Sequence, residues 1–265
     1  MIYILNSLDR WEKPYGIDTV VDFSSGTLDF EKLLRMDMES RIGVFRPLDK
    51  LINALLDINY PIIYLGEDEH LHPSYRFLPL PEVFFQRDAR DVAIDLLGKI
   101  ILRRVDGRLL MGKILETEAY YGPEDPASRA YRGMKNYNRG MWLPGGHIFV
   151  YMVHANWMFN ITTDKGEAQA VLIRAVEPLM GLDYMYKRRG RKLKELCNGP
   201  GKWTQAFGIV RKMNEKPLGG EIVVVESPWR GFDIKSSHRI GVRADLGEPL
   251  RFFIPSKFVS NNKIF

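Results

Sequence analysis

Apolar positions in the first 80 residues form two kinds of pattern. The runs MIYIL, TVVDF and PIIYLG are typical of strands, whereas residues 29–42 and 47–59 repeat apolar side chains at helical intervals. The sequence therefore predicts a small α/β domain over residues 1–80. Residues 70–84 contain several prolines and are predicted to form a linker.

A strand-rich pattern follows over residues 81–265. Residues 87–99 place Val92, Leu96 and Leu97 on one face of a helix. Further helices are predicted at 179–189 and 200–208. Strand patterns occupy 100–104, 109–120, 146–161, 169–178, 221–226, 238–242 and 249–255. Many strands with few, unevenly placed helices predict an α+β domain on a curved, largely antiparallel sheet rather than a doubly wound one.

Charge is divided unevenly between these two parts. The 265-residue chain has a net charge of +5, but residues 1–80 carry −5 and residues 81–265 carry +10. Such asymmetry suggests that the second part faces a polyanion, although solvated surface lysines and arginines would give the same count.

Compartment and cofactors are bounded by what the sequence lacks. The chain has one cysteine, Cys197, and no Cys/His cluster with zinc spacing. The N-terminus has a short apolar run without a basic lead, unlike a signal peptide or an anchor. We expect an intracellular protein with no metal, no cofactor and no membrane contact.

The segment KILETEAYYGPEDPAS contains the first candidate chemistry. Side chains alternate along a strand, so Glu116, Glu118 and Tyr120 share one face. The turn residues of GPEDP then send the chain around a corner and leave that strand end beside a pocket. The alternative is an ordinary solvent-exposed strand face.

Residues 136–161 combine basic residues, aromatics and glycines before and within a strand. This composition suits phosphate binding and base stacking. The alternative for Tyr151, Trp157 and Phe159 is a place in the core.

Taken together, these motifs resemble those of the alkyladenine (3-methyladenine, methylpurine) DNA glycosylases. KILETEAYYGPEDPAS, NRGM, FVYM, Asn160-Ile161, LIRAVEP and CNGPGK occur in the family's order over residues 86–258. The resemblance implies a curved antiparallel core like that of formyltransferase C-terminal domains. It also implies metal-free hydrolysis of N-glycosidic bonds in double-stranded DNA that contains damaged purines, without lyase activity.

The resemblance also implies site residues. Glu118 matches the general base that activates water, and Arg174 matches an arginine that holds this water and the glutamate. A backbone carbonyl around Ile240 to Val242 would contact the same water. For the base pocket, Tyr120 and Tyr151 match aromatic walls, and Asn160 matches the residue that excludes guanine by its exocyclic amine. Residues implied to approach DNA are Arg139, Met141, Met152, His154 and Lys202.

Physical chemistry supports these roles independently. A glycosidic bond inside a duplex is unreachable until the nucleotide is extruded, and aromatic walls recover part of that cost by stacking. As the base leaves, the sugar gains oxocarbenium character. An anionic Glu118 would therefore both deprotonate water and stabilise positive charge.

Two positions depart from the family pattern. Arg129 stands where relatives usually have a histidine at the pocket wall, and His154 stands where an intercalating tyrosine is usual. An arginine at the wall can stack on a base but repels a cationic alkylpurine. This substitution favours neutral lesions, such as hypoxanthine or ethenoadenine, over 3-methyladenine or 7-methylguanine. Histidine is planar enough to intercalate, and the alternative for His154 is an exposed strand residue.

Two other functions are open at this stage. A catalytically silent binder of damaged DNA would keep the groove but lack turnover, and acyl or formyl transfer rests on fold analogy alone. The first 80 residues loosely resemble small archaeal-virus-type α/β proteins, but Val44 replaces the histidine of their SRIG motif. Protein contact, dimerisation or structural support is predicted for them instead.

Overall fold

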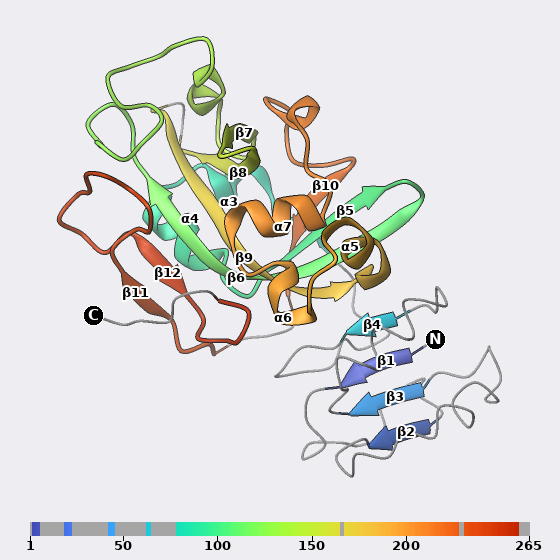
Figure 1. Cartoon of the computed structure of the whole chain (residues 1–265). Helices are drawn as coiled ribbons and strands as arrows, with labels where there is room; N and C mark the ends of the chain where they lie inside the picture. The colour runs from blue at the N-terminus through green and yellow to red at the C-terminus, as the bar shows by residue number, and fades with distance from the viewer. Residues whose placement is uncertain are drawn as a thin grey trace.

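The computed structural model describes residues 2–5, 19–22, 42–45, 62–64, 78–164, 167–227 and 231–259. From residue 78 onward the described chain builds a curled antiparallel sheet with a few helices packed against it (Figure 1). The predicted fold class is confirmed for this part.

Two long strands form the centre of the sheet. β6 (Arg108–Tyr120) and β9 (Gln169–Met180) pair antiparallel, and β5 (Ile100–Val105) and β10 (Ile222–Val225) extend the sheet on the β6 side. Near the other end of β6, β12 (Arg251–Phe253) pairs with it and with β11 (Lys235–Ser237). On the far side of β9, β8 (Asn156–Thr163) pairs with β9 and with β7 (Ile148–Val153). β6 therefore has two different partners along its length, which is how the sheet curls.

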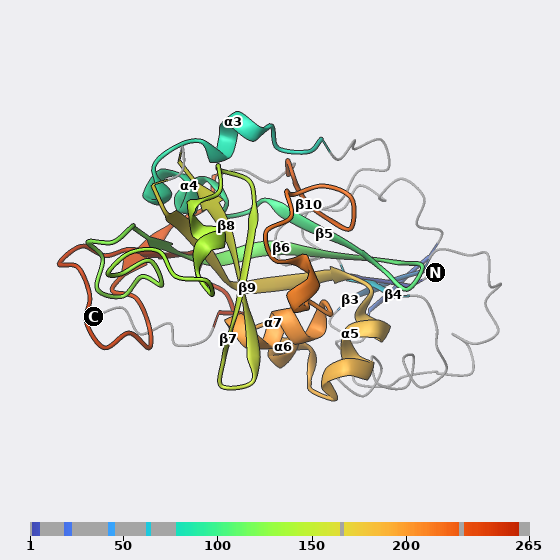
Figure 2. The same ribbon diagram turned by 90° about the horizontal axis from the view of Figure 1, so that it is seen from above.

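Helices cover both faces of the β6–β9 pair (Figure 2). On one face lies α4 (Ala89–Asp95), where the Asp88 side chain caps the helix and the carbonyl of Ala93 accepts a hydrogen bond from Thr117. On the other face lies α7 (Pro200–Ala206), whose buried Trp203 donates to the carbonyl of Ile173 at 2.8 Å. The shorter elements are α3 (Glu82–Phe85), η1 (Arg139–Trp142), α5 (Leu182–Arg189), α6 (Leu193–Leu196) and η2 (Arg211–Met213).

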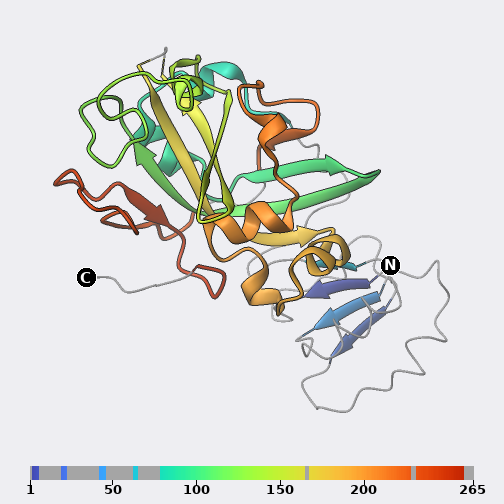
Figure 3. The same cartoon turned by 45° about the horizontal axis from the view of Figure 1, so that its top comes forward.

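Four short parallel strands precede this body: β1 (Ile2–Leu5), β2 (Thr19–Asp22), β3 (Ile42–Phe45) and β4 (Ile62–Tyr64). Three of them were predicted, and β3 was not. One residue pair, Ile63 with Met180, joins β4 to the end of β9 (Figure 3). The two helices predicted at 29–42 and 47–59 lie outside the described residues, and the domain boundary at residue 80 stays a prediction.

Several predicted elements need correction. The helix predicted from 179 begins at Leu182, because β9 continues to Met180 and Gly181 takes a left-handed φ of 82°. Residues 238–242 are not a strand, since the neighbouring strand ends at Ser237. The predicted linker is wrong over its last residues, because α3 begins at Glu82. The strand predicted over 146–161 is a hairpin that turns at His154 and Ala155, both with positive φ.

Candidate active site

An irregularity in the pairing of β6 with β9 shapes the centre of the site. Glu116 pairs with Ala175 and Thr117 with Ile173, so that Leu115 on one strand and Arg174 on the other have no direct partner. Such a bulge turns side chains away from the regular alternation, and it is common beside functional sites. It directs Arg174 toward the two glutamates of β6.

Glu118 is fully buried and accepts three hydrogen bonds. Its Oε1 accepts from the backbone N–H of Ile240 at 2.8 Å and from Arg174 Nη1 at 3.1 Å. Its Oε2 accepts from the hydroxyl of Tyr120 at 2.8 Å. The alternative of a solvent-exposed strand face is therefore wrong, and the carboxylate is held rigidly by donors from three segments of the chain.

A second buried glutamate holds Arg174 in place. Glu116 Oε1 accepts from Arg174 Nε at 3.0 Å and from Arg251 Nε at 2.6 Å, while Glu116 Oε2 has no partner. Glu116 and Arg174 balance Glu118 and Arg251, so four charges form a neutral buried group. Because isolated buried charges are costly, each member depends on the others. The carboxylates raise the pKa of Arg174 against the opposing effect of its burial, so the guanidinium stays charged.

An apolar cluster lies directly beside Glu118. Tyr120, Met158 and Leu172 are buried in it, and Tyr151 and Val242 pack against them. Burial first, and then the negative charge of Glu118, raises the pKa of Tyr120 well above its usual value. The phenol therefore stays protonated at neutral pH and donates to Glu118.

Asn160 lies two strands away from Glu118 in the same row of the sheet. Both residues pair with Leu172, so the three side chains emerge on one face. Asn160 is buried and its amide donates to the carbonyl of Phe149 at 3.1 Å. The structure thus brings together seven of the predicted residues: Glu118, Tyr120, Tyr151, Asn160, Arg174, Ile240 and Val242.

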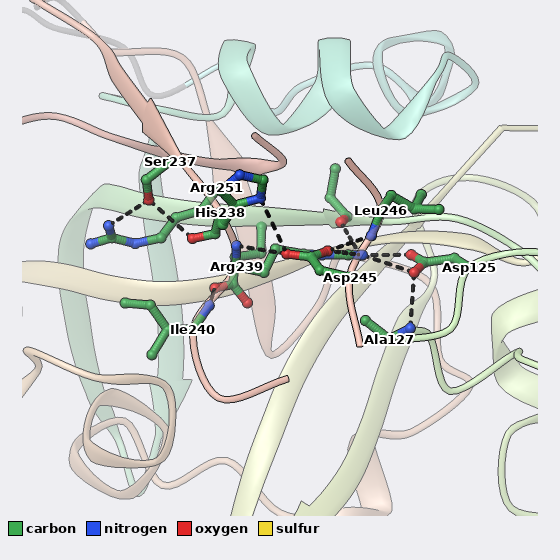
Figure 4. A network of polar contacts seen from close by, with 11 residues as sticks. Asp125, Ala127, Ser237, His238, Arg239, Ile240, Asp245, Leu246 and Arg251 are labelled. Carbon is green, nitrogen blue, oxygen red and sulfur yellow. Dashed lines mark hydrogen bonds and ion pairs between the residues drawn. The ribbon is translucent and has the colours of Figure 1, made fainter. Parts of the chain in front are cut away.

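A buried arginine anchors the loop that contributes Ile240 (Figure 4). Arg239 donates two hydrogen bonds to Asp125, at 2.6 and 2.8 Å, and further bonds to Asp245. It also donates to the carbonyl of Ala119 at 2.9 Å, and its guanidinium lies 4.6 Å from the ring centre of Tyr120. One side chain therefore fixes the loop before Ile240, the corner after β6 and the outer face of Tyr120.

The corner that follows β6 also positions Arg129. Asp125 accepts from the N–H groups of Tyr121 and Ala127, which confirms the predicted turn. Beyond it, the exposed Arg129 stacks on Tyr151 with 4.6 Å between its Cζ and the ring centre. Arg129 therefore lies beside one of the predicted aromatic walls.

The β7–β8 hairpin ends in an exposed turn at the edge of the molecule (Figure 2). His154 forms this turn with Ala155, and the side chain of Met152 is 51 % exposed. The start of α7 lies against the hairpin, since a Cβ on Gly201 would come within 2.7 Å of Asn156. Lys202 is half-buried there and donates to the side chain of Asn198 at 2.9 Å.

Two residues of the NRGM loop differ in their surroundings. Arg139 is exposed and donates to both oxygens of Glu215 at 3.0–3.2 Å. Met141 is only 2 % exposed and packs with Phe149 and Ala130. The prediction that the Met141 side chain approaches DNA is therefore corrected, because a buried thioether supports the loop from inside and cannot contact a ligand.

Sequence reasoning missed Arg239, Asp125, Asp245 and Arg251, and gave Glu116 no role of its own. Asp125 lies in the GPEDP motif and Arg239 directly precedes Ile240, so both were adjacent to predicted residues. Their pairing spans 114 positions in the chain, and no local spacing signals such a contact.

Metal sites and membrane spans were also searched for in the described part of the chain. No group of three or more His, Cys, Asp or Glu side chains there is placed to hold a metal ion. Nor does any helix in the described ranges combine the length and apolar character needed to cross a membrane.

A buried carboxylate at the end of a curled antiparallel sheet, beside tyrosines, agrees with the comparisons with known proteins. The family model described as methylpurine-DNA glycosylase matches residues 83–258, and the chain belongs to this family. It is thereby a DNA glycosylase of the 3-methyladenine class, a hydrolase of N-glycosyl compounds.

Similar proteins come from bacteria and archaea, and each is described as "Putative 3-methyladenine DNA glycosylase". One from Carboxydothermus hydrogenoformans is 43 % identical over 188 residues, which cover 68 % of this chain and 98 % of that protein. One from Agrobacterium fabrum is 43 % identical over 68 % of this chain and 92 % of its own length. One from Methanoculleus marisnigri is 38 % identical, with coverages of 69 % and 99 %.

Proposed function

We propose that this glycosylase is monofunctional and hydrolyses the N-glycosidic bond of a flipped-out damaged purine with a water activated by Glu118. The observation behind the proposal is the placement of one buried carboxylate, bound by Tyr120, Ile240 and Arg174, directly beside an apolar cluster.

The hydrogen bonds of Glu118 support its role as general base. A carboxylate has about four acceptor positions. Three are taken, two on Oε1 and one on Oε2, so Oε2 has one position left for a water. Arg174 favours the ionised carboxylate, and an ionised Glu118 would also stabilise the oxocarbenium character of the sugar. The side chains that contact Glu118 include no lysine, whose amine a Schiff-base lyase would need.

The space between Tyr120 and Tyr151 is the proposed base slot. Stacking on such rings recovers about 1–3 kcal/mol per base toward the cost of extrusion. Asn160 lies in the row of Glu118 and Leu172, where its amide would meet a purine edge and exclude guanine. The exposed hairpin turn would place His154 in the gap that the flipped nucleotide leaves, with Met152, Arg139 and Lys202 near the DNA.

Release of hypoxanthine from a defined duplex tests the proposal. After incubation with the full chain, alkaline treatment nicks the strand wherever a base has been removed. A nick that requires Glu118 supports the hydrolase. Gel-shifted duplex without any nick would instead support a silent binder of damaged DNA.

Arg129 is expected to set the preference between lesions. Its guanidinium lies over Tyr151 and would repel a cationic base in the slot. The enzyme should therefore release hypoxanthine or ethenoadenine faster than 3-methyladenine or 7-methylguanine, relative to the spontaneous loss of each base. Arg129→His should shift this ratio toward the cationic bases. Single-turnover excision on four matched duplexes measures it, and faster release of the cationic bases by both proteins would refute the role of Arg129.

For the first 80 residues, structural support is the proposed role, with dimerisation or another protein contact as the alternative. The pairing of Ile63 with Met180 favours support, because it continues the main sheet into the parallel strands.

A further inference from the structure

A groove of about 760 Å³ runs along the outer edge of β7. Its lining includes Arg129, Tyr137, Met152, Trp157 and Arg211, but neither Glu118 nor Tyr120. Tyr137 is 57 % exposed and Met152 51 % exposed, which is unusual for side chains of this size. The groove is thus a separate surface that meets the base slot only near Arg129 and Tyr151.

Strand alternation places the groove and the slot on opposite faces of the β7–β8 hairpin. Tyr151 pairs with Met158, and both belong to the apolar cluster beside Glu118. Met152 pairs with Trp157, and both line the groove. Because directly paired residues share a face and their neighbours take the other, the hairpin stands between the two surfaces.

The groove is also positively charged. Arg139 at its side is compensated by Glu215, which raises the pKa of Arg139. Arg211 is exposed, and no carboxylate of the described residues forms an ion pair with its guanidinium. Arg211 is therefore the cation of this groove that is available to an anionic ligand.

Polar backbone groups extend this character. On the outer edge of β7, the carbonyl of Ile148 accepts from Glu215 and the N–H of Val150 donates to the side chain of Asn214. Because alternate residues of a strand point their backbone groups to the same side, the N–H and C=O of Met152 also face the groove. An aromatic, polar and basic groove suits a nucleotide strand better than an apolar partner.

We propose that this groove binds the complementary DNA strand, opposite the flipped nucleotide, with Arg211 on a phosphate and Tyr137 against the sugar or base. The inference rests on the proposed function. If the hairpin turn enters the duplex at the lesion, the two strands lie on either side of the hairpin. The slot then takes the nucleotide of the lesion strand, and the groove takes the other strand.

The test compares neutral phosphates on the two strands. Duplexes carry a tetrahydrofuran abasic analogue, so that binding is measured without excision, and a single methylphosphonate is moved along either strand. Equilibrium affinity is determined for the full chain and for Arg211→Ser. Arg104→Ser is the matched control, because Arg104 is exposed and pairs on β6 with Leu109, about 30 Å along an extended strand from Glu118.

Arg211→Ser should weaken binding several-fold and lower the salt dependence of log K by about 1, as expected for one lost phosphate contact. At one or two positions of the complementary strand, the methylphosphonate should weaken the unaltered protein but not Arg211→Ser. On the lesion strand, both proteins should lose affinity equally. Tyr137→Ser should lower affinity without changing the salt dependence.

The proposal is overturned if Arg211→Ser binds like Arg104→Ser, or if its loss couples to phosphates of the lesion strand. If the coupling is found but no purine is released from any duplex, the groove assignment stands and the hydrolytic function fails.

Discussion

Glu118→Gln should abolish purine release while the chain stays folded and still binds lesion duplex. The amide keeps the size of the side chain but cannot take a proton from water, and loss of a general base typically costs about 10²- to 10⁴-fold in rate. The amide also cannot compensate Arg174, which now lies 3.1 Å from a charged oxygen. Single-turnover excision of hypoxanthine, followed by alkaline cleavage, measures the effect.

Glu124→Gln is the matched control for this variant. Glu124 is an exposed carboxylate on the corner after β6, and its replacement should leave the rate unchanged. Denaturant unfolding and a gel shift with an abasic-analogue duplex establish that Glu118→Gln is folded and binds. Base release by Glu118→Gln at the rate of the unaltered protein would remove Glu118 from the reaction and leave the hydrolytic mechanism without a base.

Arg239→Met should lower the free energy of unfolding by about 3–5 kcal/mol, the usual cost of leaving a buried charge without its partner. The side chains of Arg239 and Asp125 are both fully buried, and Asp245 is also bound to this guanidinium. The same change removes the cation that lies over Tyr120 and frees the loop that holds Ile240 against Glu118. Excision should therefore fall in the fraction of protein that remains folded.

A triple variant separates uncompensated charge from positioning. Arg239→Met combined with Asp125→Asn and Asp245→Asn removes the buried charges together, so it should recover part of the stability but not the excision rate. Arg90→Met serves as the surface control, because the Arg90–Glu248 pair is exposed and contributes at most about 1 kcal/mol. Urea unfolding and single-turnover rates measure both effects. If Arg239→Met is as stable and active as Arg90→Met, the anchoring role is wrong.

Prediction from sequence succeeded where the signal was local. Val92, Leu96 and Leu97 share one helical face and are all buried, and the alternation of Glu116, Glu118 and Tyr120 is that of a real strand. The strand predicted over 146–161 was wrong, because two residues without a glycine form its turn with positive φ. Such backbone strain has no sequence signature and persists because the flanking strands pair.

The identity of the glycosylase family and the residue that serves as its proposed base were set by the sequence itself, since the ETEAYYGPEDPAS motif is contiguous and its chemistry is local. What surrounds Glu118 was decided only by the tertiary structure. The bulge that aims Arg174, the N–H of Ile240 at 2.8 Å and the Arg239–Asp125 pair all join segments far apart in the chain. Spacing along the sequence cannot encode these contacts, because they exist only when the sheet curls and excludes water from charges that must then pair with one another.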